Sequence, residues 1–185
     1  MSRQTPALKP QDVVVALALS LSPSWTFASV AASLGMSASE VHGAVKRLRT
    51  ARLYSEDRRG PAVDNVLEFL VHGIKYVFPA EPGPVRRGVA TSVSARPLRE
   101  HFSGAAGPLS EFVWPTADGT DAGQSVEPLF PTVPDAALRN PALHELLSLV
   151  DALRIGRVRE RAAAEEELRR RLTVSSQDRS APRAP

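Results

Sequence analysis

Apolar residues recur at helical spacing in three successive segments near the start of the sequence. The first predicted helix begins at Pro10, a residue that fits the first helical turn. The second spans residues 26–35, where Gly35 occupies the position of a left-handed helix stop. The third begins at Ser37, which forms a capping-box pattern with Glu40 three residues later. The apolar positions of the first and third helices are Val13, Val14, Leu17, Leu21, Val41, Ala44, Val45 and Leu48.

The next stretch has the pattern of a small hairpin followed by a fourth helix. Within residues 52–63, short apolar pairs flank a polar tip that ends in a Gly-Pro step at Gly60. Asp64 is a suitable cap for a helix over residues 64–78. The apolar face of that helix is predicted at Leu67, Leu70, Val71 and Ile74. We therefore expect residues 10–78 to form one domain of four helices and a hairpin.

Helical periodicity is absent from residues 79–134. This segment holds 9 of the 16 prolines and 6 of the 11 glycines, so it is predicted to be irregular. It also holds aromatic residues that a free linker rarely carries, namely Phe102, Phe112, Trp114 and Phe130. The pattern favours a segment that packs in part on the globular body, with residues 116–125 as its most mobile part. A plain disordered linker is the alternative.

Helical signals return towards the C-terminal end. Asn140, followed by a first-turn proline, begins the main helix of a C-terminal helical region over residues 135–172, with a break at Gly156. A strong apolar stripe there predicts either ordinary core or a dimer interface, at Leu143, Leu146, Leu147, Val150 and Leu153. The two ends, residues 1–9 and 173–185, are expected to be a flexible N-terminus and a disordered tail.

The formal net charge of +3 is unevenly distributed along the chain. Residues 1–60 carry a net charge of +4, residues 101–150 a net charge of −5 and residues 151–185 a net charge of +3. Only three of the 23 basic residues are lysines, and arginine suits bidentate contact with phosphate or carboxylate. An Arg- and Ala-biased genome is an equally good explanation of the lysine shortage. The basic N-terminal part is thus the part of the chain best suited to nucleic acid.

Residues 26–53 resemble a helix-turn-helix, in particular the winged form of MarR-like bacterial transcriptional regulators. The resemblance rests on Ala31 at the helix crossing, Gly35 in the turn and Val41 pointing back into the core. It covers roughly residues 10–78, and the hairpin stands where a wing belongs. It implies a mainly α fold with a small β-wing (α+β), sequence-specific binding of double-stranded DNA and a repressor-like role in the bacterial cytoplasm.

The apolar row of the third helix, which begins at Val41, is expected to face the core. The opposite face of this helix is then free to contact DNA. Its first turns, which usually meet base edges in the major groove, carry Ser37, Ala38, Ser39, His42 and Gly43. Basic residues farther along suit phosphates, namely Lys46, Arg47, Arg49 and Arg52. Arg58 and Arg59, at the tip of the predicted wing, are placed to enter an adjacent minor groove.

Other classes of function have less support in the sequence. Cysteine is absent, the four histidines lack metal-ligand spacing and no hydrolase or nucleotide-binding motif is present, so we expect no enzyme, cofactor or metal site. No apolar run approaches a membrane span and the N-terminus lacks a signal-peptide pattern, so no membrane partner is expected.

The alternative function is a protein-interaction module, or an antitoxin-like operon partner. In it the acidic middle of the chain and the C-terminal helices would bind another protein. The Arg- and Glu-rich residues 154–171 offer two interpretations, a second nucleic-acid patch or ion pairs along an exposed helix. The spacing favours the ion pairs. A homodimer formed through the C-terminal helices would match a two-fold symmetric DNA site.

Overall fold

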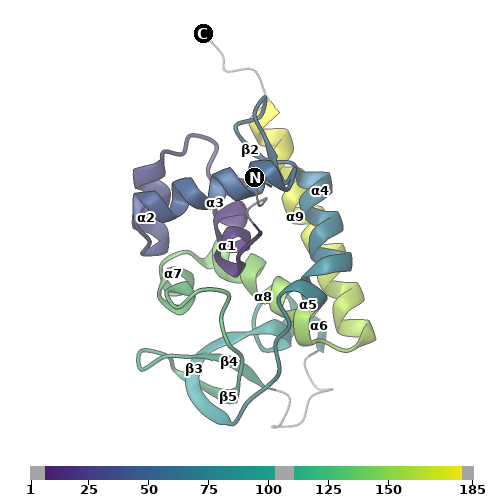
Figure 1. The fold of residues 1–185 in the computed structure, drawn as a ribbon. Helices are drawn as coiled ribbons and strands as arrows, with labels where there is room; N and C mark the ends of the chain where they lie inside the picture. Colours follow the sequence, from purple (N-terminus) through teal and green to yellow (C-terminus); the bar gives the residue numbers. More distant parts are fainter. Residues whose placement is uncertain (1–6, 103–110, 181–185) are drawn as a thin grey trace, which may run out of the picture.

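The computed structural model describes residues 7–102 and 111–180, which form helices and two small sheets (Figure 1). The N-terminal part consists of α1 (Pro10–Ser20), α2 (Phe27–Leu34) and α3 (Ala38–Thr50). Gly35 ends α2 in the left-handed conformation with φ 64°, and Ser37 and Glu40 form the predicted capping box of α3. The hydrogen bonds from Ser37 lower the pKa of the Glu40 carboxyl group. These local signals fix where α2 ends and α3 begins.

A two-stranded antiparallel hairpin follows α3, as the sequence predicts. It pairs β1 (Tyr54–Ser55) with β2 (Gly60–Pro61). The predicted fourth helix is also present, as a helical run of α4 (Val63–Glu68), the π-helical turn η1 (Phe69–Gly73) and α5 (Ile74–Val77). Asp64 does not cap it as predicted, because the helix begins at Val63 and Asp64 lies in its first turn. Its buried residues include Leu67, Leu70 and Ile74 from the predicted apolar face.

The prediction that residues 79–134 are irregular is wrong. They contribute a closed three-stranded sheet of β3 (Val85–Thr91), β4 (Phe112–Pro115) and β5 (Asp121–Ser125). β3 is antiparallel to both of the other strands, which are parallel to each other. The short elements η2 (Ser92–Ser94) and α6 (Leu98–Phe102) follow β3. The stretch expected to be most mobile, 116–125, contains β5.

Glycine is required where these strands approach one another. A Cβ atom on Gly88 would lie 2.0 Å from the carbonyl oxygen of Trp114, and one on Gly123 would lie 2.5 Å from that of Glu111. The glycines that suggested a linker therefore allow a tightly closed sheet. The aromatic residues do pack on the globular body, as expected: Trp114 is 1% exposed, and Phe102, Phe112 and Phe130 lie against the core.

The C-terminal part consists of α7 (Val133–Arg139), α8 (Pro141–Ile155) and α9 (Val158–Ser180). Asn140 caps α8 by accepting a hydrogen bond from the backbone N–H of Leu143 (3.1 Å), and Gly156 separates α8 from α9. The prediction of disorder from residue 173 is wrong up to Ser180, because α9 continues and each added residue contributes one helical hydrogen bond. The rest of the two predicted flexible ends, residues 1–6 and 181–185, lies outside the described residues.

α8 is the central helix of the molecule and lies between the N-terminal helices and α9 in Figure 1. Its apolar stripe is core: Leu143, Leu146, Leu147, Val150 and Leu153 are each at most 3% exposed. The dimer-interface alternative for this stripe is therefore wrong. No helix in the described part of the chain has both the length and the apolar character needed to cross a bilayer.

The Arg/Glu-rich helix α9 carries the predicted ion pairs on its surface. Arg169 pairs with Glu165 at 2.9 Å, and Glu167 pairs with both Arg170 (2.7 Å) and Arg171 (3.0 Å). These contacts use i,i+3 and i,i+4 spacing, as expected for a solvated helical face. Desolvation raises the pKa of the Glu167 carboxyl group, but the hydrogen bonds and charges of Arg170 and Arg171 outweigh it and lower that pKa.

Candidate nucleic-acid interface

The outer face of α3 presents the predicted base-contacting residues to solvent. The inner face is fully buried against α1 and α2, with Val41 and Ala44 at 0% exposure and Val45 and Leu48 at 1%. Ser37, Ala38, Ser39, His42 and Lys46 are exposed on the other side, and Gly43 is half-buried. Ser39, His42 and Lys46 follow one another at spacings of three and four residues, so their side chains line one helical face.

Arg47 is not on this face, contrary to the sequence prediction. Its guanidinium group donates two hydrogen bonds to the carboxylate of Asp12 in α1, from Nε at 2.8 Å and from Nη2 at 2.6 Å. The Asp12 side chain is completely buried and that of Arg47 is only 15% exposed. The hydrogen bonds to Asp12 raise the pKa of Arg47. The expected phosphate contact is replaced by a bidentate ion pair that joins α1 to α3.

Arg49 remains exposed, but its charge is balanced within the protein. Its Nε atom lies 2.6 Å from Oε1 of Glu56, and its guanidinium carbon lies 5.1 Å from the ring centroid of Tyr54. Both partners belong to the hairpin segment, so Arg49 links the end of α3 to the hairpin. It is therefore a weaker candidate for phosphate binding than the sequence predicts.

Four predicted cations remain available to a polyanion. Lys46, Arg52, Arg58 and Arg59 are exposed, and within the described residues none of them forms an ion pair. We call these four residues the free cations. Lys46 lies on α3, Arg52 lies just after it and the other two lie at the hairpin tip. The φ angles of Arg52 (59°) and Arg59 (45°) are positive, so both residues occupy the left-handed region at bends of the chain.

Four rings connect the hairpin to α3 in a contiguous series that we call the aromatic row. Trp25 makes edge-on contacts with Tyr54 in β1 and Phe27 in α2, at centroid distances of 6.4 and 5.2 Å. Phe27 in turn contacts the ring of His42 on α3, at 5.3 Å. Trp25 Nε1 also donates a hydrogen bond to the carbonyl oxygen of Arg59 (2.6 Å). Trp25 is not among the residues predicted from the sequence, although a tryptophan in a short loop beside a helix cap is a usable signal.

The turn between α2 and α3 is supported from the C-terminal half of the chain. Thr132 Oγ1 donates a hydrogen bond to the carbonyl oxygen of Leu34 at 2.5 Å, and Arg139 Nη2 donates one to that of Ser33 at 3.4 Å. A Cβ atom on Gly35 would lie 3.4 Å from the Thr132 side chain. Residues 132–139 therefore hold the turn in place from the side of α7.

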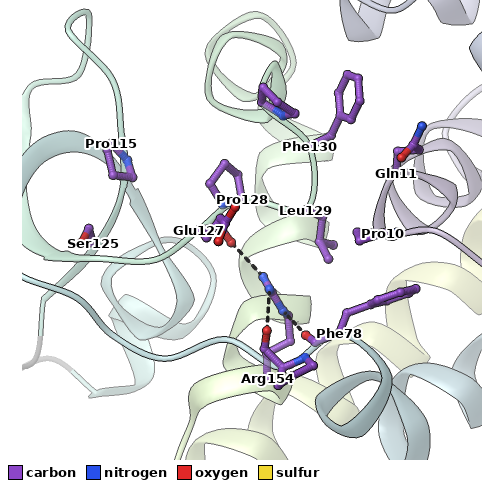
Figure 2. A pocket seen from close by; sticks show the side chains of 12 residues that line it. Pro10, Gln11, Phe78, Pro115, Ser125, Glu127, Pro128, Leu129, Phe130 and Arg154 are labelled. Carbon is purple, nitrogen blue, oxygen red and sulfur yellow. Dashed lines mark hydrogen bonds between the residues drawn. The ribbon is translucent and has the colours of Figure 1, made fainter.

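A separate groove of about 830 Å³ lies between α1, the loop after α5 and residues 125–131. Figure 2 shows its lining, which is dominated by proline rings together with Phe78, Leu129 and Phe130. The Arg154 side chain is among the lining residues and is only 5% exposed. Arg154 donates hydrogen bonds to the carbonyl oxygens of Phe78 (2.9 Å) and Glu127 (3.2 Å) (Figure 2). It also donates one to Asp151 Oδ1 (2.7 Å). Its donors thus bind the protein itself.

The Asp151 carboxylate lies at the centre of this polar network. It is 1% exposed and also accepts hydrogen bonds at Oδ2 from Thr91 Oγ1 (2.9 Å) and Trp114 Nε1 (2.6 Å). Burial raises the pKa of Asp151, while the positive charge of Arg154 opposes that shift. We call Arg154, Asp151, Thr91 and Trp114 the Arg154 network. It joins α8 to the three-stranded sheet and to the groove walls, which is a structural role.

The chain has no detected relative that would assign a function to either site. No family model, curated protein or solved structure matches it. Within the described residues, no three His, Asp or Glu side chains gather as the ligands of a metal ion would. The geometry of α3 and the hairpin is therefore the main guide to function.

Proposed function

We propose that this protein binds double-stranded DNA through α3 and the β1–β2 hairpin, as a winged helix-turn-helix, and acts as a repressor-like transcriptional regulator. The observation that carries the proposal is the exposed row of Ser39, His42 and Lys46 on α3, an element that contacts the hairpin bearing Arg58 and Arg59. Ser39 and His42 supply hydrogen-bonding groups for base edges, and Lys46 and Arg52 supply charge for phosphates. Arg58 and Arg59 would reach an adjacent minor groove or its phosphates.

The position of the acidic segment supports this proposal. Its strands β4 and β5 lie at the end of the molecule opposite the hairpin (Figure 1). Asp121 in β5 and Asp118 just before it therefore lie away from the proposed DNA-binding face. Repulsion between these two residues and DNA, which favours the protein-interaction alternative, is reduced by this arrangement, whereas Asp135 lies on α7, beside the α2–α3 turn.

Removing three of the free cations should weaken DNA binding in a salt-dependent way. The variant K46A/R58A/R59A is expected to reduce the slope of log K against log salt concentration by about 2–3, because each lost phosphate contact contributes roughly 0.9. The measurement is fluorescence anisotropy of a labelled duplex from the gene's own upstream region, between 50 and 200 mM salt.

The variant R86A/R157A/R159A is the matched control. It also removes three exposed arginines, from β3, the α8–α9 junction and the start of α9, at the end of the molecule opposite the hairpin. It should leave the slope within about 0.5 of the wild-type value. Equal losses in both variants would indicate that net charge alone attracts the DNA. If the wild-type protein shows no salt-dependent binding to DNA, the proposal is refuted.

Ser39 and His42 should set sequence preference rather than general affinity. We expect S39A/H42A to weaken binding to the preferred site by about 1–3 kcal/mol and to leave binding to unrelated duplexes unchanged. The preferred site is first selected from a random duplex library, and both duplexes are then titrated at one salt concentration. A uniform loss on both duplexes would contradict base-specific contact by these two residues.

A further inference from the structure

The hairpin is too small to hold its own orientation. Each strand has only two residues, and an isolated two-stranded hairpin is at best marginally stable in water. Its tip must therefore be held by contacts with other elements. One such contact is the ion pair between Arg49 and Glu56, the first of the four tip residues 56–59. Another is the hydrogen bond from Asn65 Nδ2 to the Arg52 carbonyl oxygen (2.7 Å), just before β1. These contacts anchor the base of the hairpin and the start of its tip.

The contact that reaches the arginine-bearing end of the tip comes from Trp25. Its indole Nε1–H donates to the carbonyl oxygen of Arg59, a residue with a φ angle of 45°. This hydrogen bond restrains the backbone at Arg59, next to Arg58 in the tip. The same indole ring packs edge-on against Tyr54 in β1 and Phe27 in α2. Trp25 thus contacts both the tip and the base of the hairpin.

The aromatic row continues from Trp25 to the exposed face of α3. Phe27 contacts the ring of His42, one of the residues proposed to reach base edges. Rings are stiff side chains with few rotatable bonds, so a series of ring contacts fixes distances better than a series of long polar side chains would. The contacts of Trp25 and Phe27 therefore fix the position of the hairpin tip relative to the face of α3 that is proposed to contact DNA bases.

We propose that Trp25 is a positioning residue that sets the hairpin arginines, Arg58 and Arg59, at a fixed distance from α3. The fixed distance lets the arginines and α3 contact adjacent grooves of one duplex at the same time. This inference rests on the proposed DNA-binding function. It assigns a role in that function to a residue that makes no DNA contact itself.

The test is a double-mutant cycle between Trp25 and the hairpin arginines. W25F keeps an aromatic ring and removes the N–H donor. It should weaken binding to the labelled upstream duplex roughly five- to tenfold in the wild-type background. In the R58A/R59A background, W25F should cause no further weakening, because the arginines that Trp25 positions are already absent. A residue needed only for folding would weaken both backgrounds equally.

Limited trypsin digestion gives a second measurement that does not depend on DNA. Trypsin cleaves after arginine, so cleavage after Arg58 and Arg59 should become several-fold faster in W25F if the hairpin tip is released. W114F is the control, since Trp114 is the only other tryptophan and its indole N–H also donates a hydrogen bond, to the carboxylate of Asp151 and not to the hairpin. W114F should leave both the cleavage at the tip and the affinity for DNA unchanged under folding conditions.

The outcomes separate this inference from the function on which it rests. If the wild-type protein binds DNA and W25F weakens binding only when Arg58 and Arg59 are present, the inference is supported. If W25F leaves binding unchanged, or weakens it equally in both backgrounds, the inference is overturned and the proposed function stands. The absence of wild-type binding overturns both.

Discussion

The variant R47A should lose about 3 kcal/mol or more of its free energy of unfolding. Removal of one partner from a buried, hydrogen-bonded ion pair leaves the other charge buried without compensation. Here that charge is the carboxylate of Asp12, which is 0% exposed in the first turn of α1. For a domain of this size the loss corresponds to a fall in Tm of roughly 6–12 °C. Urea unfolding followed by circular dichroism measures it.

R49A is the matched control for R47A. Arg49 lies two residues farther along α3, and its ion pair with Glu56 is exposed on both sides, at 45% and 66%. An exposed pair of this kind contributes at most about 1 kcal/mol. If R47A instead keeps wild-type stability and reduces the salt slope of DNA binding by about 0.9, Arg47 is a phosphate contact and the structural role assigned to it is wrong.

Local signals explain why the N-terminal elements could be predicted from the sequence. The capping box of Ser37 and Glu40, the left-handed Gly35 and the apolar stripe beginning at Val41 each act within a few residues. They fix the limits and the phase of α3 without knowledge of the rest of the fold. The exposure of Ser39, His42 and Lys46 follows directly from that phase.

Long-range contacts explain what could not be predicted. Arg47 lies beside Ala44 at the edge of the buried stripe, and its partner Asp12 is 35 residues away in sequence. Helical phase alone does not show that such a partner exists. Likewise, Gly88 and Gly123 suggest a linker in the sequence. Only the approach of Trp114 in β4 and of Glu111, the residue before β4, shows why they must be glycine.

Ion pairs within the protein also change the distribution of available positive charge. Six basic residues between 46 and 59 suggest one continuous patch for phosphates. Asp12 and Glu56 engage two of them, and the remaining four are the free cations. The predicted salt dependence of DNA binding is therefore smaller than the sequence alone would suggest, and it is concentrated at Lys46, Arg52 and the hairpin tip.

The variant R154A should be destabilised by about 3–5 kcal/mol, a large part of the stability of a typical domain. The Arg154 side chain is 5% exposed, and its loss would leave the buried Asp151 carboxylate without its cation. The carbonyl oxygens of Phe78 and Glu127 would also lose a donor. Thermal unfolding followed by tryptophan fluorescence suits this test, because Trp114 donates to Asp151 and reports on the network directly.

A control and a second variant make this prediction specific to the Arg154 network. R169A removes an exposed arginine paired with Glu165 on α9 and should cost less than about 1 kcal/mol. D151A removes the other charge of the pair. The losses in free energy of unfolding caused by D151A and by R154A should therefore sum to more than the loss caused by the double variant D151A/R154A. Strict additivity, or an R154A protein within about 1 kcal/mol of the wild type, would show that the pair does not act as one unit. Arg154 would then not be the group that joins α8 to the sheet.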